Sequence, residues 1–167
     1  MVENNRILIG CKENSIYLMA EGHITANLSF PLREDLYKKI STLKFIENIF
    51  MDLSKTDYMD STFMGLLVGI ERKLFSTFKA HLYVINPTEI ANKLLKSMRM
   101  DIFLKIEEKP IPSDIEFSIF DENIEISENE RTKIVLVAHK DLSSLSEENA
   151  KRFKALEDIL EKQIKDK

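Results

Sequence analysis

Apolar residues in the first hundred positions alternate between short continuous runs and stripes with helical spacing. The runs at residues 6–11 and 15–20 are separated by the polar residues 12–14, which predicts an antiparallel hairpin. Further strands are predicted at residues 45–53, 81–85 and 102–106. The run at 45–53 shows no clean alternation, which is typical of a strand that is covered on both faces.

Between these runs, apolar residues recur three or four positions apart, as amphipathic helices require. The three stripes are Leu32, Leu36, Ile40 and Leu43; Phe63, Leu67, Ile70, Leu74 and Phe78; and Ile90, Leu94, Leu95 and Met98. The second helix contains Gly65 and Gly69. Because glycine costs about 1 kcal/mol relative to alanine inside a helix, we expect close packing against a neighbour there. The third helix is predicted to start at Asn86-Pro87, with Asn86 as its N-cap.

The order of the predicted elements is β-β-α-β-α-β-α-β. Strands that alternate with helices favour a largely parallel sheet. The sequence therefore predicts an α/β fold: a mostly parallel sheet with the antiparallel N-terminal hairpin at its edge and helices packed on it. Residues 1–108 form the predicted domain.

The composition changes after this domain. Residues 107–130 contain nine acidic side chains and one basic side chain. We interpret residues 109–130 as an acidic linker or irregular cover, with a short strand at 115–120. Residues 131–167 are predicted to form amphipathic helices that dock on the domain or form a homodimer, with binding of a separate signalling partner as the alternative. The run at 134–139 could equally be a strand, but its stripe continues further and favours a helix.

The overall composition excludes several classes of protein. The chain has 167 residues and a net charge of −4, which gives no basic footprint for nucleic acid. No run approaches the roughly 18 apolar residues of a membrane span, and the N-terminus is unlike a signal peptide, so we expect a cytoplasmic protein. The single Cys11 excludes a disulfide framework and is expected to be buried. His23, His81 and His139 show no metal-ligand spacing, and neither a metal nor a cofactor is expected.

The candidate chemistry lies at Asp60-Ser61-Thr62, which places a hydroxyl beside a carboxylate at a predicted helix N-terminus. Asp60 and Ser61 are favoured there simply as N-cap residues. Alternatively, Ser61 is a modification site, where a phosphoryl group would bring about −1.5 to −2 charges onto a surface beside apolar side chains. A Gly-x-Ser-x-Gly elbow and a Gly-rich phosphate loop are both missing from the sequence. We therefore do not expect an enzyme.

Two stretches resemble one known family. Residues 49–67, IFMDLSKTDYMDSTFMGLL, and residues 84–106, with Asn86-Pro87 after a strand, are similar to the STAS domains of anti-sigma factor antagonists, also called anti-anti-sigma factors. The resemblance covers roughly residues 6–108, and the order of elements agrees with it. It implies a signalling adaptor in transcription regulation that acts by partner switching.

The resemblance also implies the site residues. In such antagonists the serine after the aspartate is phosphorylated by an anti-sigma factor that is also a serine kinase, and a serine phosphatase resets the switch. Ser61 stands at that position, with Asp60 and Thr62 as supporting residues. The expected partner-binding face is the turn after the third strand together with the exposed side of the next helix: Thr56, Asp57, Tyr58, Met59, Met64, Val68 and Arg72.

Three residues depart from the family pattern. Phe63 and Arg99 stand where glycine is common, and Thr25 stands where many antagonists have an acidic residue. Thr25 and Phe63 favour the alternative hypothesis, a STAS scaffold subunit of a sensory or transporter-associated complex that is not phosphorylated. Retention of Asp60-Ser61-Thr62 favours the phosphorylated antagonist. A small α/β enzyme that uses Ser61 is the least favoured hypothesis.

Overall fold

The computed structural model describes residues 4–166, which form one six-stranded sheet with helices against it. The strands are β1 (Arg6–Lys12), β2 (Ser15–Ile24), β3 (Asn48–Met59), β4 (His81–Ile85), β5 (Lys105–Glu107) and β6 (Ser118–Ile119). Their order is β5-β4-β3-β2-β1-β6, in which β2 to β5 are parallel while β1 runs antiparallel to both of its neighbours. The predicted α/β fold class and hairpin are confirmed, although β6 rather than the hairpin forms the edge.

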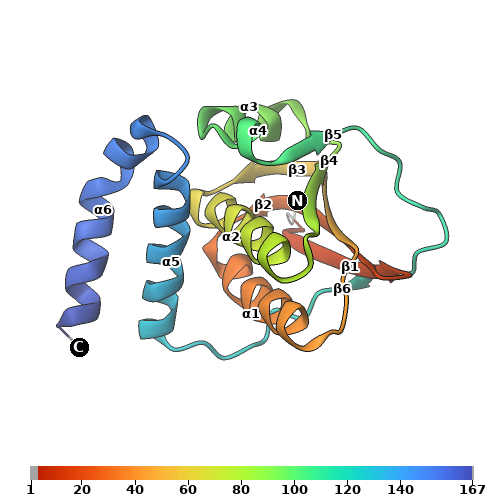
Figure 1. The fold of residues 1–167 in the computed structure, drawn as a ribbon, viewed down its shortest axis with the longest axis horizontal. Coiled ribbons are helices and arrows are strands. Elements are labelled where there is room, and N and C mark those ends of the chain that lie inside the picture. The colour runs from red at the N-terminus through yellow and green to blue at the C-terminus, as the bar shows by residue number, and fades with distance from the viewer. Residues whose placement is uncertain (1–3, 167) are drawn as a thin grey trace.

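The helices are α1 (Ala26–Thr42), α2 (Ser61–Phe78), α3 (Glu89–Ser97), α4 (Met100–Phe103), α5 (Glu128–Ser143) and α6 (Glu147–Lys165). Helices α1 and α2 lie side by side against one face of the sheet, while α3 and α4 lie beside β5 (Figure 1). The apolar stripes of α1 and α2 meet the sheet there, and Leu32, Leu36, Phe63 and Leu67 are completely buried. This contact forms the main core.

The opposite face of the sheet carries a row of stacked aromatic rings. Successive strand residues point to opposite faces, so Tyr17 of β2, Phe50 of β3 and Tyr83 of β4 project away from the main core. The ring centroids of Tyr17 and Phe50 are 4.7 Å apart, and those of Phe50 and Tyr83 are 5.3 Å apart. The segment between β5 and β6 packs on this row through Ile111, Ile115 and Phe117.

Two predicted boundaries near the sheet are wrong. Strand β3 continues to Met59 because residues 55–59 pair with β2, so the polar stretch is a strand and not a turn. The third helix starts at Glu89 with Thr88 as its N-cap, not at Asn86. Asn86 instead has φ 53°, and its side chain bonds to Asp52 and to the backbone of Lys109. These tertiary partners outweigh its local preference for a cap.

Two further predictions are corrected. Residues 102–103 end the short helix α4, and the last predicted strand is confined to Lys105–Glu107. Cys11 is exposed, because it lies near the end of β1 next to the hairpin turn. No helix within residues 4–166 has the length and apolar character needed to cross a membrane.

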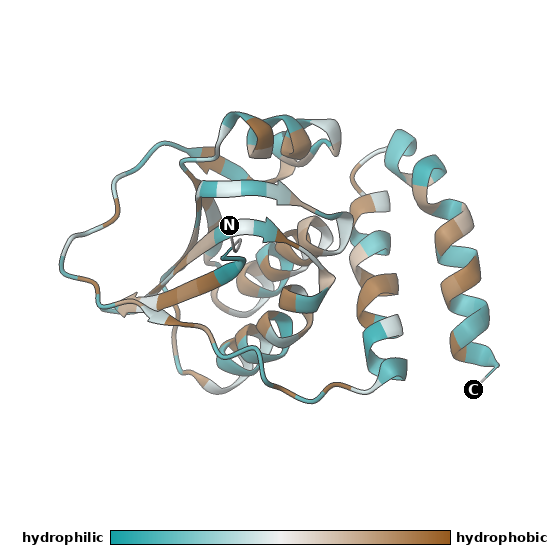
Figure 2. Ribbon diagram, turned by 180° about the vertical axis from the view of Figure 1, so that it is seen from behind, coloured by the Kyte–Doolittle hydropathy of each residue, from teal (hydrophilic) through white to brown (hydrophobic). Residues whose placement is uncertain are grey.

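The C-terminal part of the chain forms a helical hairpin. Both helices start at serine N-caps: the hydroxyl of Ser127 accepts from the N–H of Glu130, and that of Ser146 accepts from the N–H of Asn149. The preference for a helix over residues 134–139 is confirmed. Helix α5 packs on α2, and α6 packs on the outer side of α5 (Figure 1). Apolar and hydrophilic positions alternate along both helices (Figure 2).

Candidate functional site

Asp60 is the residue that joins the first turns of two helices. Its Oδ1 accepts a hydrogen bond from the N–H of Phe63 at 2.9 Å, which caps α2. Its Oδ2 accepts from the N–H of Ala26 at 2.8 Å, at the start of α1. Thr25, the N-cap residue of α1, makes no side-chain cap bond, so Asp60 supplies a side-chain acceptor to the open N–H groups at the start of α1. Asp60 therefore has a structural role whatever happens at Ser61.

Ser61 is the first residue of α2, and its hydroxyl bonds to a histidine from the C-terminal hairpin. Ser61 Oγ lies 2.8 Å from Nε2 of His139 in α5, and Nδ1 of the same ring lies 2.7 Å from the carbonyl oxygen of Val135. Because a carbonyl can only accept, Nδ1 carries the proton in the neutral ring, and Nε2 accepts from the Ser61 hydroxyl. The His139 side chain is buried, and its ring packs edge-on against Phe153 of α6.

The two helices approach closely because α2 has glycine at their contact. A Cβ atom on Gly65 would lie 2.2 Å from the carbonyl oxygen of Ala138, so no larger residue fits without moving α5. A Cβ on Gly69 would lie 2.7 Å from the hydroxyl of Tyr37 and 3.1 Å from Oδ2 of Asp141. The expected close packing at both glycines is confirmed, and the main neighbour at Gly65 is the backbone of α5.

Further along α2, Arg72 adds polar bonds to the contact between α2 and α5. Its guanidinium donates to Oδ1 of Asp141 at 2.6 Å and to the hydroxyl of Ser144. Burial raises the pKa of Asp141, and the positive charge of Arg72 opposes that rise without cancelling it. At 3.6 residues per turn, Ser61, Gly65 and Arg72 share one face of α2. We call this face, defined by Ser61, Gly65, Gly69 and Arg72, the Ser61 face.

The structure corrects part of the expected partner-binding surface. The exposed members are Asp57, Tyr58 and Arg72. The buried members are Thr56, Met59, Met64 and Val68, with exposed fractions of 0%, 0%, 2% and 0%. Thr56 and Met59 are buried while Asp57 and Tyr58 between them are exposed, because the pairing of β3 with β2 shifts register at this point. Met64 and Val68 are buried because α2 is covered on more than its sheet side. Thr62, expected to support the phosphorylation site, is also buried.

The residues that depart from the family pattern have clear structural positions. Phe63 is completely buried in the main core, so its ring does not project over Ser61. Arg99 has φ 61°, a left-handed conformation that glycine adopts without steric cost. Thr25 precedes α1, and its carbonyl accepts from the N–H groups of Leu28 and Ser29.

Sequence reasoning missed His139, Ala138 and Asp141 as parts of the site. His139 lies 78 positions after Ser61, and nothing in one sequence pairs residues so far apart. The available signal was indirect: two glycines spaced four apart in one helix, and an alanine in the apolar stripe of a later helix.

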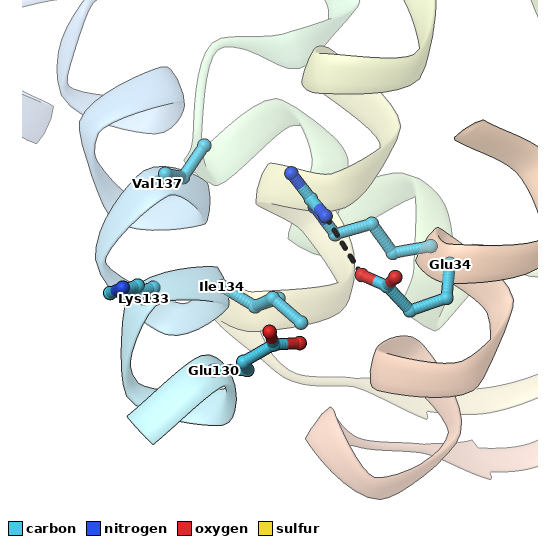
Figure 3. Close-up of a pocket in the computed structure, with 6 residues that line it drawn as sticks. Glu34, Glu130, Lys133, Ile134 and Val137 are labelled. Atoms are coloured by element: carbon cyan, nitrogen blue, oxygen red, sulfur yellow. Dashed lines mark hydrogen bonds and ion pairs between the residues drawn. The ribbon is translucent and has the colours of Figure 1, made fainter. Parts of the chain in front are cut away.

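A serine hydroxyl that donates to an oriented histidine is also the arrangement that activates a nucleophile. The surroundings of this pair do not suit a substrate, since the His139 ring is 2% exposed and lies within the packing of α2, α5 and α6. A nearby cavity of about 310 Å³ between α1 and α5 is lined by Arg33, Glu34, Glu130, Lys133, Ile134 and Val137, and so does not include the pair (Figure 3). The bond joins α5 to the first turn of α2.

Comparison with solved structures identifies the fold. The candidate anti-sigma factor antagonist TM1081 of Thermotoga maritima superposes with a TM-score of 0.54 in its crystal structure and 0.55 in its NMR structure, at 19% identity. Each covers 60% of this chain, with 85% and 79% of the TM1081 chain matched. The anti-sigma factor antagonist SpoIIAA, in its unphosphorylated form, gives a TM-score of 0.50 at 16% identity, over 60% of this chain and 84% of SpoIIAA.

Neither protein-family models nor curated protein sequences match the chain. The likeness therefore rests on three-dimensional structure. Since the superpositions cover most of each antagonist but 60% of this chain, the chain is longer than the shared fold. It has the STAS fold of the anti-sigma factor antagonists.

Proposed function

We propose that this protein is a signalling adaptor of the anti-sigma factor antagonist type, which binds an anti-sigma factor with serine kinase activity and is switched by phosphorylation of Ser61. The observation that carries the proposal is the position of Ser61, the first residue of α2 directly after its Asp60 N-cap, in a chain with the antagonist fold. The description of SpoIIAA as unphosphorylated supports a phosphorylation switch in this fold.

The proposed modification is a phosphoryl transfer. Oγ of Ser61 forms a bond to the γ-phosphorus of a nucleoside triphosphate held by the partner kinase. The bond from that phosphorus to the β-phosphate oxygen breaks, the nucleoside diphosphate leaves, and the hydroxyl proton passes to a base of the kinase. A serine phosphatase hydrolyses the phosphoserine and returns the chain to its first state.

The charge of the phosphoryl group gives the switch its physical basis. The positive end of α2 favours an anion, but the carboxylate of Asp60 is adjacent and repels it. The exposed neighbours Asp57 and Tyr58 lie just before the site on β3. A partner surface that fits a neutral hydroxyl beside these residues would meet about −1.5 to −2 charges after phosphorylation. The antagonist would then release its partner.

A scaffold subunit that is not phosphorylated is the second candidate function. One observation favours it: the Ser61 hydroxyl is engaged by His139 and lies against α5. A scaffold would keep this contact permanently and would bind its partner in a sensory or transporter-associated complex through another surface.

The deciding experiment is to isolate the full chain from its native cell in two growth conditions, with intact mass measurement and peptide mapping. We expect a condition-dependent gain of one phosphoryl group on Ser61, together with loss of a co-purifying kinase-like partner. A Ser61→Ala chain is the control and should keep the partner in both conditions. If Ser61 is always unmodified while one stable partner is present throughout, the antagonist function is wrong and the scaffold remains.

A further inference from the structure

The hairpin of α5 and α6 covers the part of α2 that the proposed function needs. Helix α5 supplies His139 to the Ser61 hydroxyl, the Ala138 carbonyl to Gly65, and Asp141 to Arg72. These contacts extend from the first residue of α2 to its middle. A kinase active site must surround the acceptor hydroxyl, and it cannot do so while α5 lies on the same face.

At its inner end the hairpin is attached by polar contacts as well as by apolar packing, in which Leu142, Leu145 and Phe153 join the main core. Nδ2 of the buried Asn149 donates to the carbonyl oxygens of Met98 and Leu142, both at 2.9 Å, while its Oδ1 has no partner. Arg152 of α6 also contacts Met98. A share of polar contacts is typical of interfaces between parts of a chain that move relative to each other.

Packing is incomplete near the other end of α5. The cavity of about 310 Å³ described above separates α1 from the first turns of α5, where Glu34 faces Glu130 and Ile134 (Figure 3). Two carboxylates line this cavity together, and Glu34 is already paired with Arg33 on its own helix. The first half of α5 therefore leaves part of the surface of α1 uncovered, although the guanidinium of Arg131 lies over the Phe30 ring at 5.6 Å from its centroid.

The connection to the hairpin permits departure but limits its distance. Residues 109–120 are fixed to the domain through Asn86, the aromatic row and the β1–β6 pairing. Residues 121–127 have no helix or strand and are mostly exposed. Seven residues reach roughly 25 Å when extended. A short tether holds its ligand at an effective concentration on the order of millimolar, so the hairpin re-docks readily unless its place is filled.

A phosphoryl group on Ser61 would occupy the space that His139 takes when the hairpin is docked. Ser61 Oγ and His139 Nε2 are only 2.8 Å apart, which leaves no room for phosphorus and its oxygens between them. The Ser61 hydroxyl now donates to Nε2, and an Oγ esterified to phosphorus has no proton with which to keep that bond. The negative charge would also lie beside the carboxylate of Asp60, the residue before Ser61.

We propose that the α5–α6 hairpin is a displaceable cover of the Ser61 face, and that a docked hairpin and phosphoserine at position 61 exclude each other. This rests on the proposed function for its biological meaning, since it is the regulation of that same site. The kinase and the binding partner reach α2 only when the hairpin is undocked, and phosphorylation then keeps the hairpin undocked. By linkage, whatever stabilises the docked hairpin opposes phosphorylation to the same degree.

The test uses the full purified chain and needs no partner. Phosphoserine is incorporated during translation at position 61 in one sample and at position 76 in the other, and amide hydrogen exchange is measured by mass spectrometry. Ser76 is the matched control, because it is exposed on the same helix and bonds only to the carbonyl of Lys73. We expect phosphoserine at 61 to accelerate exchange in α5 and α6 at least tenfold, and phosphoserine at 76 to leave it unchanged.

Exchange in β3 and β4 separates local opening from unfolding. If these strands keep their protection while α5 and α6 lose it, the cover is displaceable. The proposal is overturned if α5 stays protected with phosphoserine at 61, or if the strands lose protection to the same extent as the hairpin.

A second pair of variants opens the hairpin without phosphate. Ala138→Glu places a charge at the buried contact with Gly65, whereas Ile159→Glu places the same charge at an exposed position of α6. We expect only Ala138→Glu to accelerate exchange in α5 and α6, with β3 unchanged. Equal exchange in the two variants would contradict the proposal that the hairpin is a displaceable cover. Because these tests use purified protein, they can succeed even if Ser61 is never phosphorylated in the native cell, so the two proposals fail separately.

Discussion

The backbone N–H of Ala26 donates to the carboxylate of Asp60 across 2.8 Å, although the two residues begin different helices. The same carboxylate caps α2 through the N–H of Phe63. We expect Asp60→Ala to lower the free energy of unfolding by about 2 kcal/mol, because it removes an N-cap and a second hydrogen bond. Denaturant unfolding measures this, with the exposed Asp57→Ala as a control. Equal effects of the two substitutions would show that the double cap contributes little.

The contact of Gly65 with Ala138 predicts a difference between two glycines of one helix. Alanine at 65 meets a backbone oxygen of α5, which cannot move without the helix, whereas alanine at 69 meets only the ends of the Tyr37 and Asp141 side chains, which can rotate away. Gly65→Ala should therefore release α5, seen as faster amide exchange in α5 and α6. Gly69→Ala should keep the hairpin protected and regain part of the roughly 1 kcal/mol that glycine costs in a helix. The reverse order would contradict this packing.

The Ser61–His139 bond predicts an energetic coupling between residues far apart in sequence. In a double-mutant cycle of Ser61→Ala and His139→Ala, we expect a coupling free energy of about 0.5–1.5 kcal/mol from denaturant unfolding. The coupling should vanish in an Ala138→Glu background, where the hairpin is undocked. Coupling near zero in the otherwise unchanged chain would mean that the bond does not hold α5.

The acid dependence of stability should include a contribution from Glu21. Burial raises the pKa of this carboxyl, but the hydrogen bond and charge of Arg6, together with Lys55, outweigh burial and leave the pKa below its ordinary value. A depressed pKa stabilises the folded state above the unfolded value of about 4.5, and this contribution is lost as the pH falls through the folded pKa. Glu21→Gln should therefore flatten the loss of stability below about pH 4.5. Unfolding curves across this range test it, and an unchanged slope would contradict it.

Most of the sheet and the helices that cover it could be predicted from local pattern. The helical spacing of Phe63 and Leu67 predicts a helix, and the apolar run at 81–85 predicts a strand. Each pattern has one reasonable interpretation because its apolar residues must be buried in a core. Asn86 was misjudged because its side chain bonds to Asp52 and Lys109, which are distant in sequence. Local preference predicts a residue only where tertiary partners do not compete for it.

The sequence predicts the site residues at the start of α2 but not the residues of α5 that contact them. Asp60 and Ser61 follow from their position before an amphipathic helix, but the partner of the Ser61 hydroxyl does not. The expected exposure of Met64 and Val68 was wrong for a related reason: the sequence of α2 cannot say what covers its outer face. The sequence of the two C-terminal amphipathic helices does not show which surface of the domain they pack against.

The segment that crosses the aromatic row affects how this domain can be produced in isolation. Ile111, Ile115 and Phe117 pack over Tyr17, Phe50 and Tyr83, and β6 pairs with the outer side of β1. A chain shortened to residues 1–108 would lose both, leaving a strip of aromatic rings and an open strand edge in water. Open strand edges and exposed apolar patches promote aggregation. Shortened chains should therefore precipitate during purification, and domain boundaries for any expression trial belong after Phe120.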